Sequence, residues 1–147
     1  KLAKILGDGN VFVNFFKSWM LVLSITFLST TLFSRHATGF NIIITDDVKH
    51  FLDSLEPKAR EKIAYDMGLS QKVENRQLLK KLDDTDLWEF RTHFDGEAYR
   101  VLAFEIPGKN TMVACHAFVK KTQKTPAVEI ERGENARARY LRQHPSA

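Results

Sequence analysis

Cysteine is almost absent from this chain of 147 residues, which contains a single one, Cys115. An internal disulfide is therefore excluded, and no cysteine and histidine spacing resembles a zinc site. Cys115 falls on the more apolar face of an expected strand. We therefore interpret it as a small buried side chain rather than a reactive thiol, and we expect neither a metal nor any other cofactor.

A long apolar run is also missing. The uncharged stretch at 20–33 is shorter than the ~20 residues that a membrane-spanning helix needs. Residues 1–39, with Lys17 before this stretch and Arg35 after it, are compatible with a signal-like or membrane-anchoring segment, an amphipathic extension, or upstream sequence outside the functional protein. We favour the last, because residues 40–147 form a self-contained domain. We expect that domain to be cytoplasmic, with no stable membrane partner.

Acidic residues are few near both ends of the chain but not in its middle. Residues 109–147 carry eight Lys or Arg against three Glu, residues 40–108 carry ten against fourteen Asp or Glu, and the first 39 carry four against one. This distribution indicates a local anion-binding surface near the end of the chain rather than a uniformly basic protein. The acidic middle could be covered by a basic partner.

The hydrophobic periodicity predicts a single α+β domain. We expect a strand at 40–44, a helix at about 48–55, a helix from about 57 to about 82 with a possible break near Gly68, strands at 87–94, 97–106 and 111–120, and a helix from Thr125 onward. Gly133 should leave that last helix short or frayed. The expected architecture is a small antiparallel (mixed) sheet of about four strands, with two N-terminal helices on one face and a C-terminal helix. The other face is left open for binding.

Asp95-Gly96 is a strong signal for a two-residue hairpin turn. Counting back from this turn places Arg91 opposite Arg100. Two guanidinium groups in that position repel each other unless an anion lies between them. The pair is either a phosphate clamp or a pair bridged to Glu89 or Glu105.

The third strand ends in a cationic sequence. One face of an extended segment would carry Met112, Ala114, His116, Phe118 and Lys120, and Lys121 and Lys124 follow. An imidazole, an aromatic ring and ammonium groups at one strand end suit a phosphodiester. The alternatives are a core histidine and lysines that cap a solvated strand edge. His93 is a weaker candidate for acid–base chemistry.

Several segments resemble the RelE/ParE toxin superfamily, in particular its phage-derived, Gp49-like HigB-type branch. The resemblance spans about 40–142 and is carried by Phe51–Leu55 with Pro57–Arg60, Lys80–Leu82, Leu87–Arg91, Tyr99–Leu102 and His116–Pro126. It implies a RelE-like fold and the toxin of a type II system, silenced by a helix-turn-helix (HigA-type) antitoxin. It further implies ribosome-dependent, metal-independent cleavage of mRNA in the A site. Residues 1–39 and Gly133 depart from the pattern.

On this resemblance, together with the residue pattern at the end of the third strand, we assign catalytic roles to Arg91, Arg100, His116 and Lys120, and RNA binding to Lys121, Lys124 and Phe118. The arginines would stabilise the charge of the phosphorane, while His116 and Lys120 would transfer protons. Two other interpretations stay open. One is a ParE-like toxin that poisons DNA gyrase without nuclease activity, and the other is a non-toxic remnant directed to a membrane.

Overall fold

The computed structural model describes residues 39–73 and 75–145. Almost all of the expected leader, residues 1–39, lies outside the described residues, so its boundary stays a prediction. Within the described ranges, no helix combines the length and the apolar character that crossing a membrane requires.

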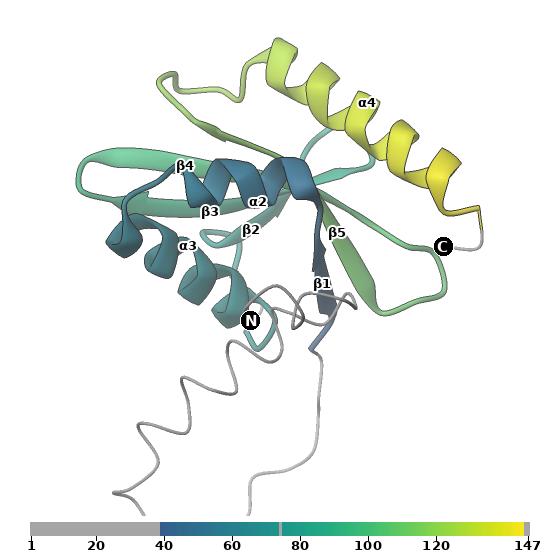
Figure 1. Cartoon of the computed structure of the whole chain (residues 1–147), viewed down its shortest axis with the longest axis horizontal. Helices are drawn as coiled ribbons and strands as arrows, with labels where there is room; N and C mark the ends of the chain where they lie inside the picture. Colours follow the sequence, from purple (N-terminus) through teal and green to yellow (C-terminus); the bar gives the residue numbers. More distant parts are fainter. Residues whose placement is uncertain (1–38, 74, 146–147) are drawn as a thin grey trace, which may run out of the picture. The chain divides into compact units, whose positions relative to one another are not determined.

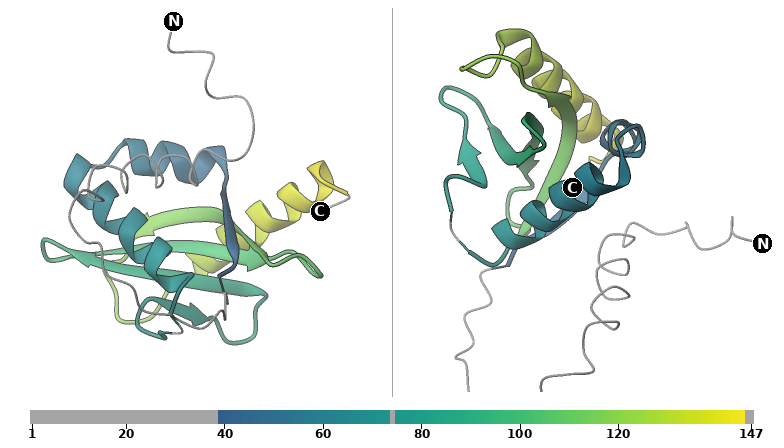
Figure 2. Two further views of the ribbon diagram at one scale, coloured as in Figure 1. Left: turned by 90° about the horizontal axis from the view of Figure 1, so that it is seen from below. Right: turned by 90° about the vertical axis from the view of Figure 1, so that its left-hand side faces the viewer.

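Five strands and three helices make up the described domain (Figure 1). In chain order they are β1 (Asn41–Ile44), α2 (Asp46–Asp53), α3 (Pro57–Ser70), β2 (Leu79–Lys81), β3 (Leu87–Phe94), β4 (Glu97–Glu105), β5 (Thr111–Val119) and α4 (Ala127–Gln143). The strands lie in the order β1-β5-β4-β3-β2, with β1 parallel to β5 and the other pairs antiparallel. Figure 2 shows the twisted sheet and its helices from two further sides. The predicted α+β class and mixed sheet are confirmed, with five described strands instead of about four.

The extra strand is β2, which we had expected to be helical. The prediction of a helix to about residue 82 is wrong, since α3 ends at Ser70. Leucines at 78, 79 and 82 fit helical spacing, but Leu79–Lys81 pairs with β3 as an edge strand, and Leu79 packs against the core. Pairing with a neighbouring strand outweighs a weak local preference here.

The hairpin between β3 and β4 is as predicted. Asp95 has φ 49° and Gly96 has φ 76°, the left-handed pair that a type I′ turn requires. The register places Arg91 opposite Arg100. The local turn chemistry therefore fixes which side chains face each other across the two strands.

Successive residues of β4 point to opposite faces of the sheet and enter two separate cores. Val101 and Ala103 pack with residues of α2 and α3, whereas Leu102 and Phe104 pack with Ala136 of α4. Our expectation that the second face is left open is wrong, because α4 covers part of it. α4 packs in a different core from α2 and α3, and an ion pair between Arg139 and Asp47 joins it to α2 (Figure 1).

Gly133 does not interrupt α4, contrary to expectation. The helix continues through it from Ala127 to Gln143. A Cβ at this position would lie 2.8 Å from Cδ1 of Leu102 and 2.9 Å from Cδ1 of Leu87. The glycine lets the helix backbone approach the sheet closely, which offsets its low helix propensity of about 1 kcal/mol.

A bulge breaks the alternation that we expected along β5. His116 pairs with Leu102 and Ala114 pairs with Ala103, so Cys115 is an extra residue between them. Upstream of the bulge Ala114 belongs to the α2/α3 core, while downstream Phe118 belongs to the α4 core. The expected face shared by residues 112 to 120 is therefore wrong upstream of His116. The bulge therefore puts His116 and Phe118 on the α4 side of the sheet.

Candidate functional site

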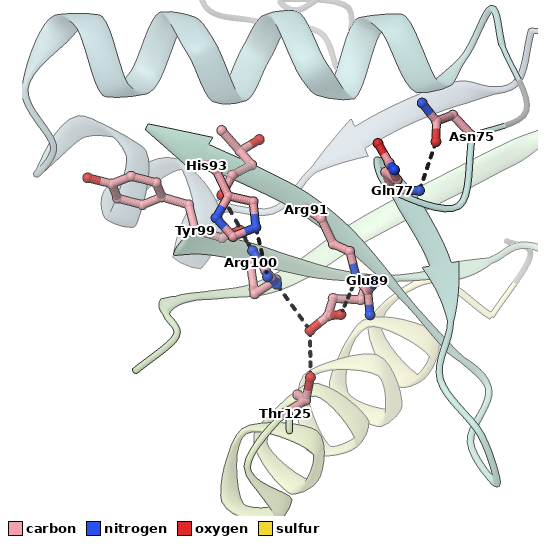
Figure 3. Close-up of polar contacts among 9 residues, drawn as sticks. Asn75, Gln77, Glu89, Arg91, His93, Tyr99, Arg100 and Thr125 are labelled. Carbon is pink, nitrogen blue, oxygen red and sulfur yellow. Dashed lines mark hydrogen bonds and ion pairs between the residues drawn. The ribbon is translucent and has the colours of Figure 1, made fainter. Parts of the chain in front are cut away.

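Glu89 lies between the two arginines of the hairpin (Figure 3). Its side chain is fully buried on the α4 side of the sheet. Nε of Arg91 donates to Oε2 of Glu89 at 2.8 Å, and Nε of Arg100 lies 3.5 Å from Oε1. The anion that the facing arginines require is thus supplied by the protein, as one of our two interpretations predicted, and Glu89 supplies it rather than Glu105.

Glu89 is held as a carboxylate by its neighbours. Burial alone would raise its pKa, but the hydroxyl of Thr125, which donates to Oε1 at 2.6 Å, and the guanidinium of Arg91 outweigh burial. The charge of Lys120 acts in the same direction, and the resulting pKa is lowered. Because Thr125 stands just before α4, this contact also ties the start of the helix to the sheet.

Arg100 is enclosed by acceptors of the protein itself. Its side chain is 7% exposed, and Nη1 donates to the carbonyls of Tyr99 at 2.8 Å and Thr92 at 3.4 Å. Burial lowers its pKa, and the charge of Glu89 opposes this effect. The side chain of Arg91 is 25% exposed. Arg91 is therefore the guanidinium of the pair that a ligand can reach.

Lys120 follows β5 and is partly exposed. Its pKa is lowered, mainly by burial, with Glu89 opposing the shift and the charges of Arg100, Arg91 and Lys80 adding to it. An ammonium group that releases its proton more readily than usual is suited to general acid–base chemistry. The fold brings this lysine into the electrostatic environment of both predicted arginines.

His116 and Phe118 stack on each other with ring centroids 5.7 Å apart. Nε2 of His116 lies 2.5 Å from Oε2 of Glu129 on α4, and Glu129 also pairs with Arg132 at 2.8 Å. Phe118 is 8% exposed and packs in the α4 core. The histidine is thus oriented by an aromatic ring on one side and a carboxylate on the other.

Lys121 and Lys124 are exposed in the segment between β5 and α4. The hydroxyl of Thr122 donates to the carbonyl of Lys124 at 2.6 Å, which shapes this segment. Both lysines follow Lys120 in the chain, after the end of β5. Their role in RNA binding stays a prediction.

Sequence reasoning missed Lys80. This residue of β2 stands opposite Glu89 in the register, on the same face as Arg91, and its charge lowers the pKa of Lys120. We had placed it in a helix, because a strand of three residues is too short to show alternation. The contacts of Thr125 and Glu129 were missed as well, since they join segments that are distant in sequence.

Cys115 is buried, as predicted, and burial raises its pKa to about 12. Its thiol donates weakly to the carbonyls of Leu102 and Gly133. Over residues 39–73 and 75–145, no cluster of three or more His, Cys, Asp or Glu side chains could hold a metal ion. The cationic site (Lys80, Glu89, Arg91, Arg100, His116 and Lys120) is built from polar side chains on β2 to β5 and just after β5, with Thr125 and Glu129 holding it to α4.

The model of one protein family matches this chain. It is described as phage derived protein Gp49-like (DUF891), and the match covers residues 50–138, more than half of the chain. The matched range contains all the residues of the cationic site. No curated protein matches the chain.

Proposed function

Since the chain belongs to the phage-derived Gp49-like family of toxin-like proteins, we propose that it is the toxin of a type II toxin–antitoxin system. Its activity is metal-independent, ribosome-dependent cleavage of mRNA, which arrests translation in the cytoplasm. A helix-turn-helix antitoxin of the HigA type silences it.

One observation carries the nuclease proposal. Arg91, Lys80 and Lys120 gather on one face of the sheet around the buried carboxylate of Glu89. A phosphodiester supplies the negative charge that such a surface attracts, and a guanidinium binds two of its oxygens at once. The site also contains a lysine whose pKa is lowered, which nucleic-acid binding alone does not require.

The proposed reaction is transesterification within the RNA. The ribose 2′-oxygen bonds to the adjacent phosphorus while the bond from phosphorus to O5′ breaks, leaving a 2′,3′-cyclic phosphate and a 5′-hydroxyl. Of Lys120 and His116, one accepts the 2′-hydroxyl proton and the other protonates O5′. Arg91 stabilises the added charge on the phosphorane oxygens. Glu89, which also pairs with Arg100, holds Arg91 in place.

Mapping mRNA 5′ ends after brief induction of the full chain tests this proposal. We expect discrete cuts in translated mRNA, lost when Lys120 is replaced by Gln. The loss should be about 10²–10⁴-fold, the contribution of one acid–base group. Lys58→Gln changes an exposed lysine at the start of α3 and serves as the matched control. Growth arrest without cuts would overturn the nuclease proposal, and an accompanying SOS response would indicate a gyrase poison instead.

The antitoxin is tested separately by co-expression. We expect a small helix-turn-helix protein encoded beside this chain to restore growth and to co-purify with it. The acidic segment 40–108, with fourteen acids against ten bases, supports a partner whose contacting surface is basic. Growth arrest that no neighbouring gene relieves would contradict this part of the proposal.

A further inference from the structure

A groove of about 930 Å³ lies beside edge strand β2, away from the hairpin turn. It is bounded by the end of α3, by β2 with Trp88 of β3, and by the turn that joins β4 to β5. Hydrogen bonds brace its walls. Gln71 donates to the carbonyl of Phe40 at 2.6 Å, and Asn110 donates to the carbonyl of Gly39 at 2.8 Å. The groove is part of the packed domain and not a gap between loose loops.

The walls of this groove are cationic. The described basic residues that line it are Lys72, Arg76, Lys80, Lys81 and Lys109. The described acidic residues that line it are Asp83 and Glu105. Four of these five cations come from residues 40–108, where acids outnumber bases. The fold therefore concentrates positive charge at a place where the sequence average is negative. Such a concave cationic surface attracts polyanions.

An aromatic ring lies among these cations. Trp88 lines the groove, and Nζ of Lys81 lies 5.5 Å from the centroid of its ring. Phe40 and Leu79 add apolar surface beside it. Aromatic faces interleaved with lysines and arginines bind single-stranded nucleic acid, because unpaired bases stack on the rings while the cations pair with the backbone. A duplex keeps its bases stacked inside and does not offer them in this way.

Lys80 connects the groove to the cationic site. It lines the groove, and it also stands opposite Glu89 and lowers the pKa of Lys120. Its neighbour Lys81 pairs with Trp88 on the other face of the strand. The edge strand thus carries one lysine on each of its two faces.

We propose that this groove binds single-stranded RNA next to the segment held at the cationic site, with a base on Trp88 and phosphates on Arg76, Lys80 and Lys81. The choice of RNA as the polyanion rests on the function proposed above.

Fluorescence anisotropy with a labelled 2′-O-methyl RNA of about 12 nucleotides tests the groove without cleavage, since this RNA has no free 2′-hydroxyl. The full chain is compared with Lys81→Gln, Arg76→Gln and Trp88→Leu. We expect each to weaken binding about tenfold, and each cation variant to reduce the salt slope by about 0.7. Lys58→Gln, an exposed lysine outside the groove, should bind like the wild type.

Three results would overturn the inference: no binding by the wild type, groove variants that bind like Lys58→Gln, or duplex DNA of equal length bound as tightly and through the same residues. Thermal unfolding of each variant checks the fold, and Lys81 and Arg76 are exposed, so their replacement leaves the core intact. A wild type that binds the RNA through the groove but cuts no mRNA would refute the proposed function and leave the groove assignment standing.

Discussion

The two faces of the sheet are built from alternate residues of the same strands, yet they bury side chains of different chemical character. The face under α2 and α3 buries apolar side chains such as Phe90 and Val101. The face that α4 partly covers buries Glu89 and Arg100 beside Leu102. Burying a charge pair costs desolvation that apolar residues of similar size would avoid. Stability therefore accounts for the first face, and we attribute the charges of the second to the RNA binding and catalysis proposed above.

The largest expected effect comes from Glu89→Gln. It leaves the guanidinium of Arg100 buried without its counter-ion, so we expect a loss of about 3–5 kcal/mol of stability. The pKa of Glu89 is lowered from 4.5, so this carboxylate contributes stability above that pH and loses it as the pH falls through the lowered pKa. The variant should lose that part of the acid dependence, measured by urea unfolding across pH.

Glu105→Gln, at an exposed position near the end of β4, is the control for Glu89→Gln and should change stability by no more than about 0.5 kcal/mol. Equal stabilities of the two variants would show that the charged face is no more sensitive than the surface.

A substitution on the apolar face separates stability from activity. Ile63 of α3 is 1% exposed, and Ile63→Ala should cost about 2–5 kcal/mol by leaving a cavity. At temperatures well below its Tm, the variant should still cleave mRNA as the wild type does, because the substitution leaves the cationic site unchanged. Cleavage lost from a folded Ile63→Ala protein would mean that the two faces are coupled.

Gly133→Ala tests how closely α4 approaches its face. An alanine normally stabilises a helix interior relative to glycine, but here the added Cβ meets Leu102 and Leu87. We expect a net loss of about 1–3 kcal/mol, limited by rotation of those leucine side chains. Asn135→Ala, exposed on the same helix, should instead be neutral or slightly stabilising. Thermal unfolding of both variants measures the difference.

The smallest effect concerns Cys115, on the α4 side of the sheet. Because burial raises its pKa to about 12, the thiol stays protonated in the folded protein and should not react with a thiol reagent at pH 8. Reaction should appear only in denaturant, which is easily measured because the chain has one cysteine. Rapid labelling of the native protein would show that α4 opens readily from the sheet.

Local patterns predicted the parts of the fold that local chemistry controls. The Asp95-Gly96 turn set the strand pairing and placed Arg91 opposite Arg100. The strand at 87–94 is also as predicted, and the final helix, expected from Thr125, begins at Ala127. In each case the signal lies within a few residues of the feature that it determines.

Long-range packing decides the features that the sequence did not predict. β2 exists because Leu79–Lys81 finds a partner in β3, and α4 continues through Gly133 because the sheet beneath it leaves no room for a side chain. The contacts of Thr125 with Glu89 and of Glu129 with His116 join residues that are 36 and 13 positions apart. No periodicity in the chain encodes such pairs.

The central claim is that the accessible cations of the α4 side act on RNA, and Arg91→Gln tests it most directly. Purified full-length protein is added to ribosomes that carry a defined mRNA. The initial cleavage rate is measured at a temperature below the Tm of the variant. We predict discrete cuts by the wild type and by Arg60→Gln, an arginine of α3 whose side chain is 44% exposed. Folded Arg91→Gln should be about 10²–10³-fold slower. Cleavage by Arg91→Gln at the wild-type rate would contradict the account.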